Sequence, residues 1–269
     1  RRSGSRMGPA GGVDRALVPS FNTKGERELR VAPKPSVDAE LPAALRAEDV
    51  LSFDPARYDL RGEAATLLER SGPIVGFGCF DSGSLNLEDF HADEQAFTSF
   101  KYEKHWRRCV GEAATFLDAY ERLIHEVVCP HMKAQLGGDA PTTFHYQFPP
   151  TLRLQPGPND HYRRLHRDAE YGHQDGEVNF WMPLTDYTKT RTTLWVESLP
   201  GAGDFHPAEL AYGEIIMFHG TLCRHHVPSN ASSCTRVSMD FRIGVSPFYD
   251  DAWNLKGIAH VHGRRECVI

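Results

Sequence analysis

The sequence of 269 residues lacks an apolar run of the roughly 20 residues that a membrane-spanning helix needs. It also lacks an excess of positive charge, and a net charge of −6 argues against a nucleic-acid partner. Its six cysteines include no CxxC pair, so neither a zinc knuckle nor a disulfide framework is indicated. We therefore predict reduced cysteines, an intracellular and cytoplasmic setting with organelle targeting left open, and a small-molecule partner.

Composition divides the chain into two parts. Residues 1–35 are rich in Gly, Ser, Arg and Pro and show no sustained period, which predicts an extended or flexible arm. The rest, residues 36–269, has ample apolar content for a core and a length that suits a single domain. We expect the helical part of this domain at about 40–138 and its β-rich part at about 143–250.

Helical patterns precede residue 138. Short ones cover residues 42–47 and 61–70, and Ser71-Gly72 is expected to stop the second before a strand that ends at Gly78. The clearest helix is expected between about 103 and 136, where apolar residues recur at spacings of three and four and form one stripe. These residues are Trp106, Val110, Ala113, Leu117, Tyr120, Ile124 and Val127. Such a stripe predicts packing against a sheet.

From Thr143 the pattern becomes that of short strands. Alternating or apolar segments separated by Gly- and Pro-rich turns cover residues 151–155, 177–184, 193–197, 213–218 and 235–243. Because no long helices separate these segments, the pattern favours a β-sandwich or jelly roll over a parallel α/β sheet.

Three residues of this β-rich part suggest a metal site. His166 and Asp168 flank Arg167, and His225 follows 59 residues after His166. Two histidines and one carboxylate are the ligand set of non-haem Fe(II) oxygenases, and they leave metal positions open for a co-substrate and O2. In a strand, residues i and i+2 point to the same side, so His166 and Asp168 could chelate one ion. An HxD tripeptide is weak evidence by itself in a chain with 14 histidines.

The last strand suggests a second half to the site. Val237, Met239, Phe241 and Ile243 share one face of it, whereas Arg236, Ser238, Asp240 and Arg242 share the other. An ordinary half-buried strand with a solvated polar face is one interpretation. With the HxD motif upstream, we instead predict that the polar face looks into a barrel mouth, where Arg236 and Ser238 bind a carboxylate.

The run His166-Arg-Asp-Ala-Glu-Tyr-Gly-His-Gln-Asp-Gly-Glu-Val-Asn-Phe-Trp-Met-Pro-Leu-Thr185 resembles the phytanoyl-CoA dioxygenase superfamily, and more closely its StrG-like branch. Residues 193–201 and 225–238 match it as well, so that the resemblance covers about residues 144–246. The resemblance implies a double-stranded β-helix, or jelly roll, with Fe(II) held by His166, Asp168 and His225. It further implies 2-oxoglutarate anchored by Arg236, with hydroxylation and release of succinate and CO2.

The chain departs from this family in its doubled His225-His226. In the family, the distal histidine lies five residues before an Asn and eleven before the Arg, which selects His225 here on account of Asn230 and Arg236. If the segment is a strand, parity also puts residues 219, 221, 223 and 225 on one side. We predict His225 as the ligand and keep His226 as the alternative.

Further site residues are predicted more loosely. Arg153 is a second candidate for binding the co-substrate, and the polar residues Tyr171, His173, Glu177 and Asn179 are candidates for substrate contact. The neighbouring acids Glu170, Asp175 and Glu177 would suit an amine or guanidinium on the substrate.

Two functional readings compete. An intact Asp168 argues against a halogenating variant, which needs that ligand position for halide. A metal-binding jelly roll that does not use 2-oxoglutarate, or that has lost catalysis, is the alternative to the oxygenase. Arg236 together with Ser238 favours the oxygenase, because a mere metal-binding barrel would not need them.

Overall fold

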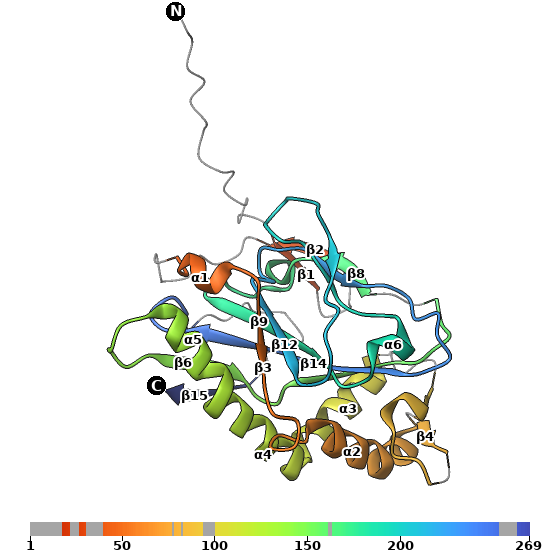
Figure 1. Ribbon diagram of the computed structural model, residues 1–269. Helices are drawn as coiled ribbons and strands as arrows, with labels where there is room; N and C mark the ends of the chain where they lie inside the picture. The colour runs from red at the N-terminus through yellow and green to blue at the C-terminus, as the bar shows by residue number, and fades with distance from the viewer. Residues whose placement is uncertain are drawn as a thin grey trace, which may run out of the picture.

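The computed structural model describes residues 18–21, 27–30, 40–76, 78–81, 83–93, 100–160, 163–252 and 263–269. Two antiparallel sheets form its centre, and helices lie along the larger sheet (Figure 1). Within the predicted N-terminal arm, β1 (Val18–Phe21) and β2 (Arg27–Arg30) pair as a two-stranded sheet, which we did not predict. The remaining residues of the arm lie outside the described ones.

The larger sheet has seven strands. Its order is β15 (Arg264–Val268), β6 (Thr143–Gln147), β14 (Arg236–Val245), β9 (Glu177–Pro183), β12 (Glu214–Phe218) and β3 (Asp49–Ser52). The seventh strand, β7 (Thr151–Gln155), also pairs with β14. Ten residues long, β14 is flanked by β9 on one side and by β7 and then β6 on the other. It is therefore fixed on both edges along its length.

The smaller sheet has four short strands, in the order β11 (His206–Pro207), β10 (Trp195–Val196), β13 (His225–Val227) and β8 (Arg163–His166). The eight strands β7 to β14 are thus divided between the sheets as β7–β14–β9–β12 and β8–β13–β10–β11. Both sheets are antiparallel, and such a two-sheet arrangement of eight strands is a jelly roll. The predicted fold class is confirmed, with sheets that do not close into a barrel.

The core lies between the larger sheet and the helices. Val237, Met239, Phe241 and Ile243, predicted to share one face of β14, are all fully buried. The helices that cover this face are α2 (Leu60–Val75), α3 (Phe100–Glu112), α4 (Ala114–Leu123) and α5 (Cys129–Leu136), with α1 (Ala43–Arg46) beside α5 (Figure 1). The opposite, polar face of β14 is consequently turned toward the smaller sheet.

The helix predicted at 103–136 is not continuous. Ala113, with ψ 81, separates α3 from α4, and a five-residue π-helical segment, Ile124–Val128, separates α4 from α5. Five of the seven stripe residues are nevertheless buried, Ala113 and Val127 are partly buried against the same core, and the stripe also contacts strand backbone. Trp106 Nε1 donates to the carbonyl oxygen of Leu152 at 2.8 Å, and the Tyr120 hydroxyl to that of Gln147 at 2.7 Å.

The helix stop predicted at Ser71-Gly72 is wrong, because α2 continues to Val75 and ends at Gly76 in the left-handed conformation, with φ 73. Gly72 serves a different purpose. A Cβ on it would lie 2.8 Å from the carbonyl oxygen of Gly78 and 3.0 Å from the Phe90 ring. The glycine thus permits close packing of α2 on β4 (Gly78–Phe80) and β5 (Phe90–Ala92), and the predicted strand begins only at Gly78.

Candidate metal centre

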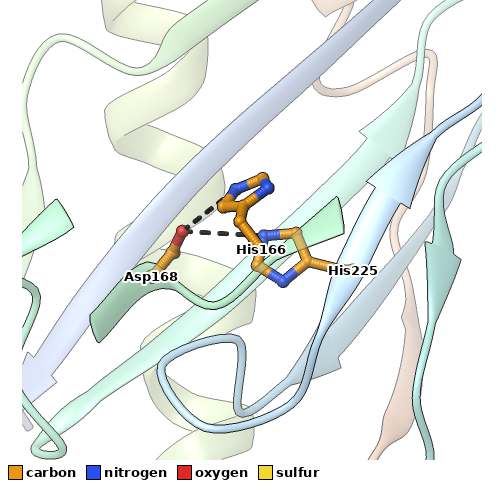
Figure 2. A group of neighbouring side chains, drawn as sticks. All are labelled: His166, Asp168 and His225. Carbon is orange, nitrogen blue, oxygen red and sulfur yellow. Dashed lines mark ion pairs between the residues drawn. The ribbon is translucent and has the colours of Figure 1, made fainter. Parts of the chain in front are cut away.

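Three side chains converge at one end of the space between the sheets (Figure 2). The Nε2 atoms of His166 and His225 each lie 3.6 Å from Oδ1 of Asp168. One ligand atom from each of the three lies within 4.8 Å of the others, and no other such group occurs among the described residues. The structure thus brings together the three predicted ligands.

Two adjacent strands and a short turn position these ligands. His166 ends β8 and His225 begins β13, and the two face each other directly in the register of the smaller sheet. We expected Asp168 to share a strand with His166, but it instead begins the 3-10 turn η4 (Asp168–Tyr171). The reason is a backbone contact, since the Asp168 N–H donates to the carbonyl oxygen of Gly220 at 2.9 Å.

His225 does not share a strand with residues 219, 221 and 223, contrary to the predicted strand parity. Residues 219–224 form a turn, in which the Cys223 N–H donates to the carbonyl oxygen of His219 at 2.9 Å, and β13 begins only at His225. His225 nevertheless lies in the cluster, whereas His226 stacks on Trp195 with ring centroids 6.3 Å apart. The spacing to Asn230 and Arg236 was therefore the better guide.

Both histidines are prepared to act as ligands through Nε2. Nδ1 of His166 lies 2.6 Å from the carbonyl oxygen of Arg164, and Nδ1 of His225 lies 3.2 Å from that of Cys223. These contacts assign the hydrogen to Nδ1 and leave the Nε2 lone pair toward the cluster. Burial, and then the nearness of His225, lowers the pKa of His166 to about 4, so that it is neutral at pH 7 as a metal ligand must be.

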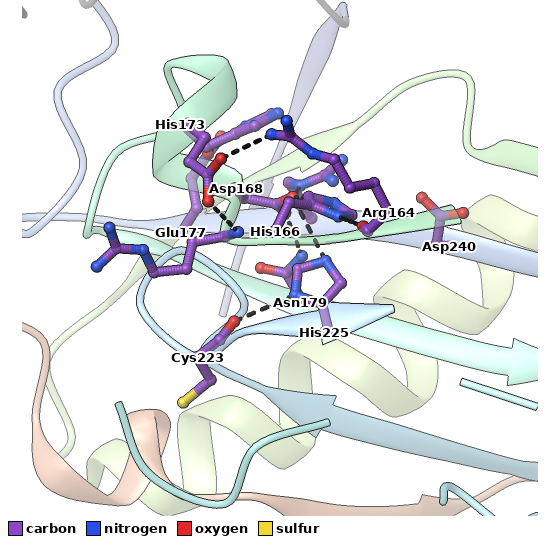
Figure 3. A network of polar contacts seen from close by, with 12 residues as sticks. Arg164, His166, Asp168, His173, Glu177, Asn179, Cys223, His225 and Asp240 are labelled. Carbon is purple, nitrogen blue, oxygen red and sulfur yellow. Dashed lines mark hydrogen bonds and ion pairs between the residues drawn. The ribbon is translucent and has the colours of Figure 1, made fainter. Parts of the chain in front are cut away.

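The carboxylate of Asp168 is almost fully buried within a network of polar side chains (Figure 3), and both of its close hydrogen bonds go to one oxygen. Its Oδ2 accepts hydrogen bonds from Asn179 Nδ2 and Arg242 Nε, both at 2.6 Å. Burial raises the pKa of Asp168, but Arg242 and His225 outweigh it and hold that pKa well below its usual range. A charged carboxylate beside two imidazole rings is a donor set that suits Fe(II).

The cavity that these ligands line also meets a buried cation, Arg236, which forms no ion pair with any described residue. Arg236 is 2% exposed, and its Nη1 donates to Gln155 Oε1 at 3.3 Å. Its Nε and Nη2, and the Ser238 hydroxyl two residues later, have no hydrogen-bond partner among the residues that the structure describes. Burial, and then repulsion by Arg153, lowers the pKa of Arg236 to about 9. Buried polar groups are rarely left without partners, so these donors fit an anionic ligand such as a carboxylate.

This cavity has a volume of about 250 Å³. It is lined by the three candidate ligands, Arg236 and, among others, Trp181, Leu194, Phe218 and Val227. Tyr171 and His173, predicted to contact substrate, also line it. Arg153 lines it too, although its guanidinium pairs with Asp240.

Two of the predicted substrate residues have partners that explain them otherwise. Glu177 is buried, binds Nδ1 of His173 at 2.7 Å and pairs with Arg264, and it is absent from the cavity lining. Asn179 lines the cavity but donates to Asp168. We did not predict that Asn179 and Arg242 hold the carboxylate, although Arg242 shares the polar face of Arg236 in the sequence pattern.

No family model matches the chain. Among solved structures it is similar to EctD from S. alaskensis (15% identity, TM-score 0.43, covering 92% of each chain). It is also similar to the non-heme monooxygenase ThoJ in complex with Ni (16% identity, TM-score 0.41, covering 82% of this chain and 87% of ThoJ). At TM-scores below 0.5, these likenesses support no conclusion about the chemistry of this chain.

A curated relative is closer in sequence. The chain is 30% identical over 162 residues to the streptomycin biosynthesis protein StrG of Streptomyces griseus. The match covers 60% of this chain and 73% of the relative, and it agrees with the resemblance that the sequence motifs carry. The chain belongs to the family of StrG.

Proposed function

We propose that the protein is an Fe(II)- and 2-oxoglutarate-dependent dioxygenase that hydroxylates a small molecule. One observation carries this proposal: a single cavity is lined both by a two-histidine, one-carboxylate cluster and by the buried Arg236, two of whose nitrogens have no partner among the described residues. The equally unpartnered Ser238 hydroxyl lies two residues from Arg236 on the same face of β14. A dicarboxylate that binds a metal through one end needs both features. The part that StrG has by name in the biosynthesis of streptomycin supports a small-molecule substrate.

Each group has a defined task in this proposal. His166, Asp168 and His225 hold Fe(II), and Arg236 pairs with the far carboxylate of 2-oxoglutarate, to which Ser238 donates a further hydrogen bond. When bound, iron and 2-oxoglutarate supply the oxidation by O2 that replaces a C–H bond by C–OH, with release of succinate and CO2. Trp181, Leu194 and Phe218 line the same cavity, and their apolar surfaces disfavour water in it.

The residues that line the cavity bear on the substrate as well. Tyr171 and His173 line the cavity and remain our predicted substrate contacts. An amine or guanidinium on the substrate, suggested by the acids at 170, 175 and 177, loses its support because none of the three lines the cavity. The two lining carboxylates, Asp168 and Asp240, are already engaged by Arg242 and Arg153.

The alternative, a metal-binding jelly roll that does not use 2-oxoglutarate, explains the cluster but not the buried donors of Arg236. An anaerobic titration separates the two proposals. We expect the Fe(II)-loaded protein to bind 2-oxoglutarate and, once air is admitted, to release succinate slowly even without substrate. Absence of both binding and succinate from an iron-loaded protein would leave the alternative.

A further inference from the structure

Asp168 is held by groups from three different places in the chain, which is more than an ordinary ion pair requires. Asn179 on β9 and Arg242 on β14 are direct cross-strand neighbours in the larger sheet. Both direct a nitrogen to the same oxygen, Oδ2, at 2.6 Å. The other oxygen, Oδ1, is the one that lies 3.6 Å from each histidine Nε2.

The amide of Asn179 has no other hydrogen bond that would account for its place. It is 5% exposed, and no described residue forms a hydrogen bond with its Oδ1. The opposite orientation of the amide would set Oδ1 against the carboxylate of Asp168, which two acceptors do not tolerate. A buried amide with one unsatisfied atom is costly, so its bond to Asp168 must offset that cost.

Gly220 makes room for this amide. A Cβ on Gly220 would lie 2.6 Å from Cγ and 2.7 Å from Nδ2 of Asn179, closer than such contacts allow. The carbonyl oxygen of the same glycine accepts the Asp168 N–H at 2.9 Å. Gly220 therefore fixes the backbone of Asp168 and, through the space it leaves, the partner of its side chain.

Arg242 is in turn fixed from behind. Its Nη1 donates to Gln147 Oε1 at 3.3 Å, and the residue is 8% exposed. A planar group held at two points presents Nε–H in one direction, which an ammonium group on a flexible stem cannot do.

We infer that Asn179, Arg242 and Gly220 form a carboxylate clamp that commits Oδ2 of Asp168 to the protein and leaves Oδ1 alone for the metal. They are positioning residues, since they act on the metal through Asp168. Binding through one oxygen keeps a coordination position free that a two-oxygen carboxylate would occupy. The inference rests on the proposed metal site, but not on 2-oxoglutarate or on turnover.

Co(II) titration of the metal-free protein is the test. Loss of a partner of a metal ligand typically lowers metal affinity about 10- to 100-fold. We expect losses of this size in Asn179→Ala, Gly220→Ala and Arg242→Lys. Arg265→Lys is the control, because Arg265 pairs with the Glu121 carboxylate and does not line the cavity, and this variant should bind Co(II) as the wild type does.

The clamp also predicts coupling between two substitutions. Asn179→Ala removes the three atoms that lie nearest to a Cβ on Gly220, so the double variant should bind Co(II) no more weakly than Asn179→Ala alone. Thermal unfolding of each metal-free variant detects loss of the fold. Asn179→Ala changes no charged group, so it still tests the clamp if Arg242→Lys does not fold. Crystals of the Co(II) forms should show one Asp168 oxygen on the metal in the wild type and two in Asn179→Ala.

The outcomes separate the two proposals. Co(II) affinities of Asn179→Ala and Arg242→Lys within twofold of the wild type would overturn the clamp while leaving the metal site intact. Tighter binding by Arg242→Lys would overturn it as well. A wild-type protein that does not bind Co(II) would remove the proposed function and the clamp together.

Discussion

Arg236 and Arg242 lie on the same face of the same strand, and both are buried, yet their surroundings differ. Arg242 donates to a carboxylate and an amide oxygen, and Asp168 raises its pKa in spite of the burial that lowers it. Arg236 has one long hydrogen bond, two nitrogens without a partner and a lowered pKa. The comparison teaches that a buried cation is part of the scaffold where its partners are present, and part of a binding site where they are missing.

The largest effect should come from the metal end. We expect His225→Ala to reduce Co(II) or Fe(II) binding below detection, because one of three ligands is lost, while Arg236 and its surroundings stay as they are. His226→Ala should bind metal nearly as the wild type does, since His226 stacks on Trp195 outside the cluster. Metal titration of both variants checks this, and the reverse order would move the ligand by one residue.

The two arginines should respond in opposite ways when each is replaced by Met in the metal-free protein. Arg242→Met leaves the buried Asp168 carboxylate without its counter-ion, which typically destabilises by about 3–5 kcal/mol. Arg236→Met removes a buried charge that lacks a counter-ion, so the free energy of unfolding should stay unchanged or rise. Denaturant unfolding of both variants measures the difference. Equal losses in the free energy of unfolding would contradict the distinction between a structural Arg242 and a ligand-binding Arg236.

The ion pair between Asp168 and Arg242 also changes the expected result of Asp168→Ala. From sequence we expect Asp168→Ala to abolish iron binding while leaving the fold largely intact. The ion pair to Arg242 indicates instead that this variant loses stability as well. His166→Ala is therefore the cleaner way to remove the metal.

Binding of 2-oxoglutarate should depend on the unpartnered arginine. Arg236→Ala should cost on the order of 2–4 kcal/mol, or about two orders of magnitude in affinity, because a charge-assisted bidentate contact is lost. Arg236→Lys should restore part of it. Iron affinity should barely change in either variant. Anaerobic titration of the iron-loaded variants provides the numbers, and an unaffected Arg236→Ala would transfer the role to another cation such as Arg153.

Arg224, which does not line the cavity, forms an ion pair with Glu197 that can be compared with the two arginines of β14. The buried Glu197 carboxylate accepts hydrogen bonds from Arg224 and from the Gly203 N–H. Burial raises the pKa of Glu197, but these donors lower it to about 2, against an ordinary value of 4.5. The resulting stability is present above pH 4.5 and is lost as the pH falls toward 2.

Glu197→Gln should thus cost on the order of 2 kcal/mol at pH 7, and the difference from the wild type should shrink as the pH falls toward 2. Unfolding curves at several pH values check the trend. A difference that is the same at pH 7 and pH 3 would mean that the charge of Glu197 contributes nothing.

The smallest effect should come from the neutral donor beside Arg236. Ser238→Ala should weaken 2-oxoglutarate binding by about 1 kcal/mol, or roughly fivefold, because one neutral hydrogen bond is lost. The same titration measures it, and metal affinity serves as the internal control. A loss as large as that of Arg236→Ala would assign the main contact to the hydroxyl instead.

Sequence patterns predicted the faces of the strands and the three candidate ligands. They did not predict the tertiary contacts that position these side chains. Alternation along residues 236–243 predicted which side chains face the core, because period-2 burial is a local property. It could not separate Arg236 from Arg242, since that difference depends on Asp168, 74 residues before Arg242 in the chain. Likewise, Gly72 looked like a helix stop because its close packing against Phe90 is a tertiary contact.

The strands that bear the two histidines are short, four residues in β8 and three in β13, whereas β14 has ten. Few backbone hydrogen bonds therefore hold the smaller sheet together. His166 and His225 face each other across these strands, so a metal bound by both would cross-link β8 and β13. By mass action, loading then stabilises the whole protein. In a cell short of iron, the empty form would open at this sheet first and become the preferred substrate of proteases.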